Sequence, residues 1–294
     1  MNFSICHLYS NTRLYMRDHY IRSWRWLALL ALLLSIGLTV VYTFLPGDAI
    51  PVSAIFGRHE HLFIPATYTF AVVAIIAASL LVYAGYQLLP AQRHIPIYDK
   101  IAQPIVFLSL LATVWLYTFT QEYLFIAWLV QVGLLILSLV IFTRIRNEMS
   151  TTLYSQYKWI QLPFTTAAAW LTFTTIVYAG VWLKSIGYEG VPFGENVVAI
   201  LAVLAVAMLA NAVHNRYHDF IFPLTIAWCC MGIYVEQRNA EKLVALVALS
   251  TGLYLVARVV VVAVRQRVVE VARVYAPVRS ADAGQVPNRR SQSA

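Results

Sequence analysis

Long apolar runs repeated along the chain are the dominant pattern of this sequence. Eight runs are helix-length, and their centres carry no charge apart from Arg258. They lie near residues 25–44, 64–88, 102–119, 123–143, 160–183, 196–213, 219–235 and 243–264. About 20 apolar residues in a helix cover the ~30 Å hydrocarbon core of a bilayer, whereas a transmembrane β-barrel shows alternating segments of about ten residues. The pattern therefore predicts an all-α, polytopic transmembrane helical bundle with eight spans.

The distribution of positive charge between the runs predicts the orientation. If the N-terminus is cytoplasmic, sixteen Lys and Arg residues fall in inner segments and four in outer loops. The outer four are Arg58, Lys184, Arg238 and Lys242. Cytoplasmic loops are enriched in Lys and Arg, so we expect both termini to be cytoplasmic. The net charge of +8 follows from this asymmetry and gives no reason to expect a nucleic-acid partner.

The composition leaves no room for a sizeable soluble domain, because 61% of the residues are hydrophobic and 12% are charged. We expect a multi-pass integral protein of a bacterial inner (cytoplasmic) membrane, surrounded by the lipid bilayer. The predicted parts are a cytoplasmic lead-in (1–24), a five-helix membrane unit (25–183), three additional transmembrane helices (184–264), and a cytoplasmic basic helix end with a disordered tail (265–294).

The span from Gln161 to Trp182 is uncharged but rich in polar and aromatic side chains. Trp170 lies near its middle, and Trp228 lies near the middle of the seventh run, whereas membrane tryptophans concentrate at the headgroup level. An indole N–H at the midplane needs a partner, so we expect both side chains to face the bundle interior or a cavity. They could line an aromatic pocket for a flat apolar ligand. An aromatic belt remains the alternative for residues at the span ends.

Three polar residues within the runs, Gln131, Asn211 and Arg258, need partners or access to water. We expect Gln131 and Asn211 to form hydrogen bonds between helices, and Arg258 to extend toward the inner headgroups.

Two histidine-containing segments could ligate a metal. His59-Glu60-His61 in the long outer loop has no identifiable third ligand, and the segment 214–219 is interpreted as a solvated turn between two spans. We therefore expect no metal site.

Motifs of enzymes are absent from the sequence: there is no G-x-S-x-G, H-E-x-x-H or Walker A motif, and no pair of intramembrane carboxylates. An enzyme is therefore not expected. Three classes remain, which are a ligand-binding protein, a secondary transporter that uses Gln131 and Asn211, and a structural membrane protein without an enclosed pocket.

Three motifs carry a family resemblance. They are Leu162-Pro163-Phe164 with Trp170 and Thr172-Phe173-Thr174, then Ile64-Pro65-Ala66-Thr67-Tyr68-Thr69-Phe70, and Thr113-Val114-Trp115-Leu116-Tyr117. With them the chain resembles the TspO/MBR family, the tryptophan-rich sensory proteins related to the mitochondrial translocator protein. It departs from the family pattern by having no tryptophan in the second run and by Tyr178-Ala179 where an asparagine is usual. Three further runs follow the first five, so the resemblance is to a longer, divergent branch.

The resemblance implies a five-helix unit, often dimeric, that binds porphyrins, haem-like tetrapyrroles or sterols and acts in sensing or transport. It implies ligand-binding roles for Tyr68, Trp115, Tyr117, Trp170 and Tyr178, to which the midplane argument adds Trp228. We expect the protein to bind, sense or translocate a hydrophobic planar ligand in an aromatic pocket in the outer half of the bundle. The loop from Pro46 to Pro65 would act as a lid. No cofactor is required, although the pocket could carry a bound tetrapyrrole, and a homodimer is compatible with this reading.

Overall fold

The computed structural model describes residues 23–42, 50–92, 94–149 and 158–282. Its helices are Ser23–Tyr42, α2 (Val52–Arg58), η1 (Thr67–Phe70), α3 (Ala71–Tyr86), η2 (Pro90–Gln92), α4 (Pro96–Thr120), α5 (Leu124–Met149), α6 (Lys158–Ser185), α7 (Glu195–Tyr217), α8 (Ile221–Gln237) and α9 (Lys242–Asp282). No β-strand occurs within these ranges. The all-α prediction is confirmed.

Seven helices in the described ranges are long and apolar enough to cross a membrane. They are Ser23–Tyr42, the continuous segment Thr67–Tyr86, α4, α5, α6, α7 and α9. α8 is also apolar, but its 17 residues make it only about 25 Å long. The protein is therefore a multi-pass helical membrane protein, as the apolar runs predicted.

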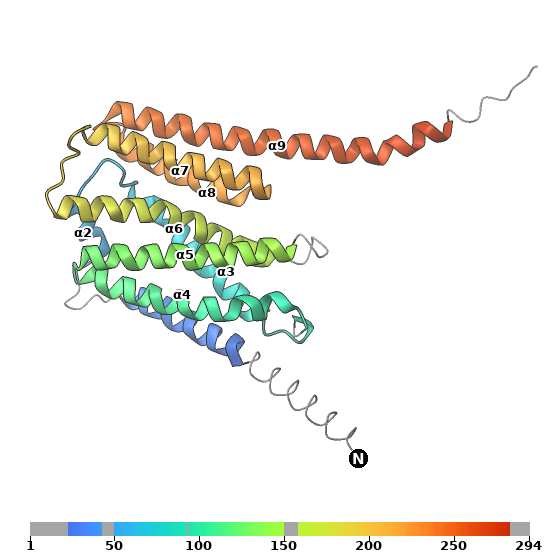
Figure 1. Ribbon diagram of the computed structural model, residues 1–294, viewed down its shortest axis with the longest axis horizontal. Coiled ribbons are helices and arrows are strands. Elements are labelled where there is room, and N and C mark those ends of the chain that lie inside the picture. Colours follow the sequence, from blue (N-terminus) through green and yellow to red (C-terminus); the bar gives the residue numbers. More distant parts are fainter. Residues whose placement is uncertain (1–22, 43–49, 93, 150–157, 283–294) are drawn as a thin grey trace, which may run out of the picture.

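The long helices lie side by side in a broad bundle, with the helix Ser23–Tyr42 and α9 at opposite edges (Figure 1). α6 packs against α3, α5, α7 and α8, and α8 packs in turn against α7, α9 and η1. In the apolar stretch of α6, 61% is buried inside the bundle, compared with 22–39% in the corresponding stretches of the other spans. Its buried residues Ala167, Ala168 and Ala169 permit this close approach of neighbouring helices. α6 is thus the central helix of the bundle.

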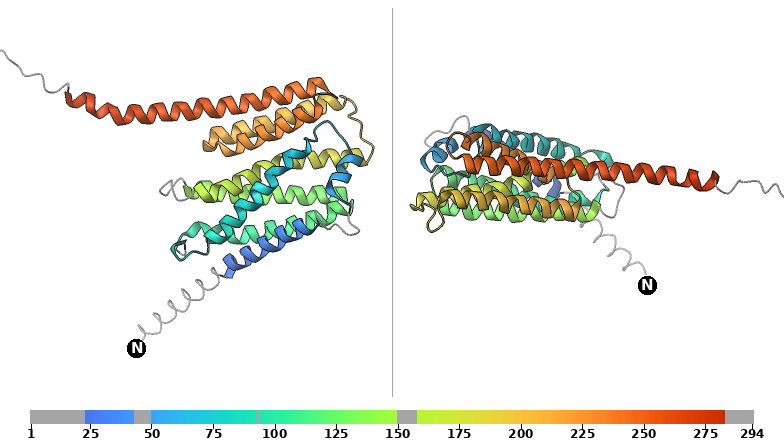
Figure 2. Two further views of the ribbon diagram at one scale, coloured as in Figure 1. Left: turned by 180° about the vertical axis from the view of Figure 1, so that it is seen from behind. Right: turned by 90° about the horizontal axis from the view of Figure 1, so that it is seen from above.

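Two helices include residues outside the predicted apolar runs. α9 continues to Asp282, so that its C-terminal half extends past the ends of α7 and α8 (Figure 2). Within the long loop that precedes the second span, the short helix α2 follows Pro51. Residues 1–22 of the predicted lead-in and residues 283–294 of the predicted tail lie outside the described residues.

Candidate functional site

Eight aromatic rings from five segments of the chain form one continuous group, here called the aromatic cluster. Its members are Phe56 of α2, Phe63 of the following loop, Phe70 of η1, Trp115 and Phe119 of α4, and Trp170, Phe173 and Tyr178 of α6. Each ring lies within about 4.5–7 Å of another, the usual range for aromatic pairs. The cluster joins α2, α4 and α6 around the entry to the second span.

Helix α2 is inserted into this cluster. The Phe56 ring is stacked on Tyr178, with the centroids 5.9 Å apart and the planes at 13°. It also lies 5.5 Å from Phe70 and 5.9 Å from Phe119. Phe56 and its neighbour Ile55 are both buried. A flat side chain from the loop therefore occupies a position between the rings of α4, α6 and η1.

Three of the predicted ligand-binding residues meet in the cluster. Trp115 lies 5.1 Å from Tyr178, and Trp170 lies edge-on to Phe70 at 5.4 Å. Trp170 and Tyr178 are buried, as expected for residues that face the interior. The indole Nε1 of Trp115 is buried and has no hydrogen-bond partner within the described parts of the chain.

The other three predicted residues lie outside the cluster. Tyr68 and Trp228 form a separate edge-to-face pair at 5.4 Å, and the Trp228 indole donates to the backbone oxygen of Thr69 at 3.1 Å. Trp228 is 42% exposed, so the expectation that it faces the interior is wrong; its N–H is satisfied at the surface between α8 and η1. Tyr117 is 52% exposed. The positions of these residues along the apolar runs did not distinguish their surface rings from the buried rings of the cluster.

The sequence analysis did not identify Phe56, Phe70 or Phe119 as site residues. Phenylalanine is common in any membrane helix, and nothing in the local pattern marks these three. Their roles follow from the return of the 50–70 segment onto α4 and α6, a long-range contact.

A pocket of about 130 Å³ lies between α6, α7 and the segment His61–Phe63. Its walls include Ala179, Gly180 and Leu183 of α6, together with Ala199 and Ala202 of α7. At one end, Lys184 Nζ lies 2.8 Å from Glu195 Oε2. The pocket is thus mainly apolar with one ion pair at its rim.

The His61 ring closes part of this pocket. Its Nε2 lies 3.0 Å from the backbone oxygen of Val177, and its Nδ1 accepts the backbone N–H of Phe63 at 3.2 Å. Burial lowers the pKa of His61 from 6.5 to about 4, which indicates a neutral ring that donates from Nε2. The ring lies so close to Gly180 that a Cβ there would come within 2.6 Å of it. Because backbone groups occupy both ring nitrogens, His61 is not arranged as a metal ligand.

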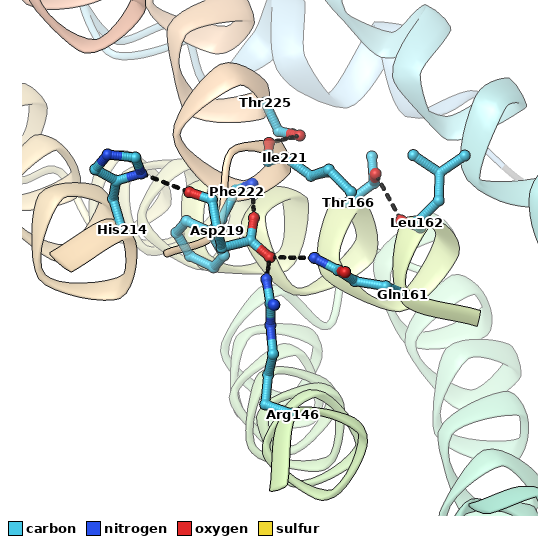
Figure 3. A network of polar contacts seen from close by, with 9 residues as sticks. All are labelled: Arg146, Gln161, Leu162, Thr166, His214, Asp219, Ile221, Phe222 and Thr225. Carbon is cyan, nitrogen blue, oxygen red and sulfur yellow. Dashed lines mark hydrogen bonds and ion pairs between the residues drawn. The ribbon is translucent and has the colours of Figure 1, made fainter. Parts of the chain in front are cut away.

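The interpretation of residues 214–219 as a solvated turn is wrong for His214 and Asp219, which Figure 3 shows and which are 2% and 1% exposed. The side chains of Asn215, Arg216 and His218 are exposed. Asp219 pairs with Arg146 of α5 and accepts hydrogen bonds from Gln161 Nε2 at 2.6 Å and from the backbone N–H of Phe222 at 2.8 Å. The Asp219 backbone oxygen lies 2.6 Å from His214 Nδ1. Asp219 therefore connects α5, α6 and α7 to the start of α8.

A sequence signal for this arrangement existed. Asp is a preferred residue just before a helix, where its carboxylate accepts an N–H of the first turn. Asp219 stands at the start of the seventh apolar run and accepts the N–H of Phe222 in this way. The buried partner Arg146 could not be identified from the local pattern.

Two of the polar residues in the spans have partners. Gln131 donates to Thr174 Oγ1 at 2.7 Å, which confirms the predicted hydrogen bond between helices, here α5 and α6. Arg258 donates to Asn215 Oδ1 of α7 at 2.6 Å. The Asn211 side-chain oxygen is buried without a hydrogen-bond partner in the described ranges, so its predicted bond between helices is not observed through this atom.

Most of the chain matches a known protein family. A family model described as TSPO-like protein matches residues 25–262, a stretch that includes α2 to α8 and runs into α9. No curated protein and no solved structure matches the chain.

Proposed function

Because the chain belongs to the TSPO-like family, we propose that this membrane protein binds, senses or translocates a hydrophobic planar ligand at the aromatic cluster. The ligand class is a porphyrin or other tetrapyrrole, or a sterol-like molecule. The proposal assigns direct ligand contacts to Trp115, Trp170 and Tyr178. A ligand that arrives from the bilayer would first meet the exposed rings Tyr68, Tyr117 and Trp228.

The observation that carries the proposal is the stacking of Phe56 on Tyr178 at an interplanar angle of 13°. A flat ring already fits between the side chains of α4, α6 and η1. If α2 withdraws, Phe56 leaves an opening walled by aromatic rings, where a planar ligand would stack in its place. α2 thus serves as a lid that excludes lipid and water from the empty site.

Trp115 supplies a polar anchor in this proposal. A buried N–H without a partner is costly, and native proteins rarely leave one unsatisfied. The Trp115 Nε1 lies at the cluster and is free to donate within the described structure. A ligand carboxylate, carbonyl or hydroxyl oxygen would accept this hydrogen bond.

Titration of the purified full-length protein with protoporphyrin IX, and separately with cholesterol, tests the proposal. Replacing both Trp115 and Trp170 by Ala removes two aromatic contacts, so we expect affinity for the preferred ligand to fall by about tenfold or more. Trp26→Ala, which removes a tryptophan that is 52% exposed on the first helix, is the matched control and should bind as the wild type does. Equal affinity of the double variant and the wild type would contradict the assignment.

A secondary transporter of a small polar substrate has weaker support. It depends on Gln131 and Asn211, and the amide of Gln131 is bonded to Thr174.

We also propose eight membrane crossings, with both termini cytoplasmic, in a bacterial inner membrane. α8 is joined to α7 by three residues and to α9 by four, connections too short to return across a bilayer. Since α7 and α9 each have the length of a span, α8 must cross between them. The sixteen-to-four distribution of Lys and Arg supports the cytoplasmic termini.

A further inference from the structure

We propose that the pocket between α6 and α7 is a second binding site, for a small apolar molecule about the size of one six-membered ring that carries a single hydroxyl group. The site would share Phe63 with the aromatic cluster but would use a different face of α6 from Trp170, Phe173 and Tyr178. It gives a ligand-binding role to α7, which lies beyond the first five long helices.

The two sites lie on different faces of α6. At about 100° per residue, the pocket residues Ile176, Ala179, Gly180 and Leu183 point roughly 130° away from the mean direction of Trp170, Phe173 and Tyr178. A ligand in the pocket therefore does not displace the rings that α6 contributes to the cluster.

The volume of the pocket indicates the size of the ligand. This volume is about 130 Å³. An apolar cavity of about 150 Å³ binds benzene, whereas sites for drug-sized molecules occupy about 300–1,000 Å³. A pocket of this volume accommodates about six or seven non-hydrogen atoms, so a tetrapyrrole or a sterol could not enter it as a whole.

The residues that line the pocket indicate the chemical class of the ligand. Small apolar residues, Ala179, Ala199 and Ala202 among them, form the walls, so an apolar body is favoured. At the rim, Lys184 and Glu195 pair at 2.8 Å, and their charges cancel. A charged ligand group would attract one partner and repel the other, whereas a hydroxyl can donate to Glu195 and accept from Lys184.

The pocket also contacts the segment that follows α2. The backbone N–H of Leu62 donates to Glu195 Oε1 at 3.3 Å, and the Phe63 ring lies 5.0 Å from Phe173 of the cluster. A molecule in the pocket would hold His61–Phe63 in place and so hold α2, three residues earlier in the chain, over the cluster. This regulatory consequence, unlike the binding itself, rests on the proposed function.

Equilibrium dialysis of isotopically labelled phenol against the purified full-length protein tests the binding. Ala202→Leu fills the pocket from α7, and Ala179→Leu fills it from α6. We expect both variants to bind phenol at least about tenfold more weakly than the wild type. The matched control is Ala205→Leu, which adds the same side chain on α7 at a position that does not line the pocket, and it should bind as the wild type does.

If both pocket variants bind phenol with wild-type affinity, the proposed site is wrong. Phenol would then partition into detergent or bind elsewhere on the protein. Benzoate, which has the same ring with a negative charge, should bind at least about tenfold more weakly than phenol, and equal binding would overturn the assignment of a hydroxyl ligand. The variant lacking Trp115 and Trp170 should bind phenol normally, so the two proposed sites fail or succeed separately.

Discussion

Asp219 supplies the carboxylate of the polar network in Figure 3, and its side chain and that of Arg146 are 0% and 7% exposed. Breaking a buried ion pair by removing one partner leaves an uncompensated charge and costs about 3–5 kcal/mol. We therefore expect Asp219→Asn to lower the free energy of unfolding by that amount, measured by thermal or denaturant unfolding in detergent.

The matched control is the exposed pair of Arg58 and Glu122, 2.7 Å apart. Arg58→Gln should cost at most about 1 kcal/mol, as for other solvent-exposed pairs. Comparable destabilisation by the two variants would show that the Asp219 network does not stabilise the bundle.

His61 makes stability depend on pH. Its pKa is about 4 in the folded protein and 6.5 ordinarily, so between these values the unfolded chain binds a proton that the folded chain does not. Stability from the neutral ring is fully present above pH 6.5 and is lost as the pH falls toward 4, by up to about 3 kcal/mol.

His61→Gln provides the comparison, because glutamine does not titrate. Unfolding measured from pH 7.5 to 4 should show a smaller loss of stability in this variant than in the wild type. Identical pH profiles would mean that the His61 ring is exposed to solvent.

At the scale of elements, α8 lies against η1 through Gly232. The Gly232 oxygen accepts the backbone N–H of Ala66 at 3.1 Å, and a Cβ at Gly232 would collide with the Thr69 side chain and approach Pro65 Cβ to 3.0 Å. Gly232→Ala must therefore separate α8 from η1. We expect a loss of about 1–3 kcal/mol in unfolding free energy, as for other overpacked sites.

Gly85→Ala in α3 is the control, because a Cβ there meets nothing within 4 Å. In a helix this change should be neutral or stabilise by up to about 1 kcal/mol. If Gly232→Ala behaves in the same way, close packing of α8 on η1 is not required.

At the scale of the whole molecule, whether α8 crosses the membrane determines the side on which the loop between α8 and α9 lies. Single cysteines at Arg216 and Arg238, both exposed, can be introduced after the native cysteines are replaced by alanine. With eight crossings, a membrane-impermeant maleimide should label position 238 from outside intact cells, and position 216 only after permeabilisation. Labelling of both positions from the same side would show that α8 does not cross.

The central position of α6 in the bundle connects the aromatic cluster, the small pocket and the Asp219 network. One face of α6 contributes Trp170 and Tyr178 to the aromatic cluster, and another lines the small pocket with α7. Its N-terminal end contributes Gln161 to the Asp219 network. A change in the packing of α6 would therefore reach all three regions.

The sequence by itself determined the all-helical, multi-pass character of the protein, because a helix in a bilayer must be apolar along its own length, and this is a local property. It also predicted ligand contacts for Trp115, Trp170 and Tyr178, and these contacts stay predictions, although the structure brings the three rings into one cluster. Only the tertiary structure decided that Phe56 completes their cluster, that Trp228 lies at the surface, and that Asp219 is buried against Arg146. These outcomes depend on contacts between segments tens to more than a hundred residues apart, and hydropathy along the chain carries no record of which helices become neighbours.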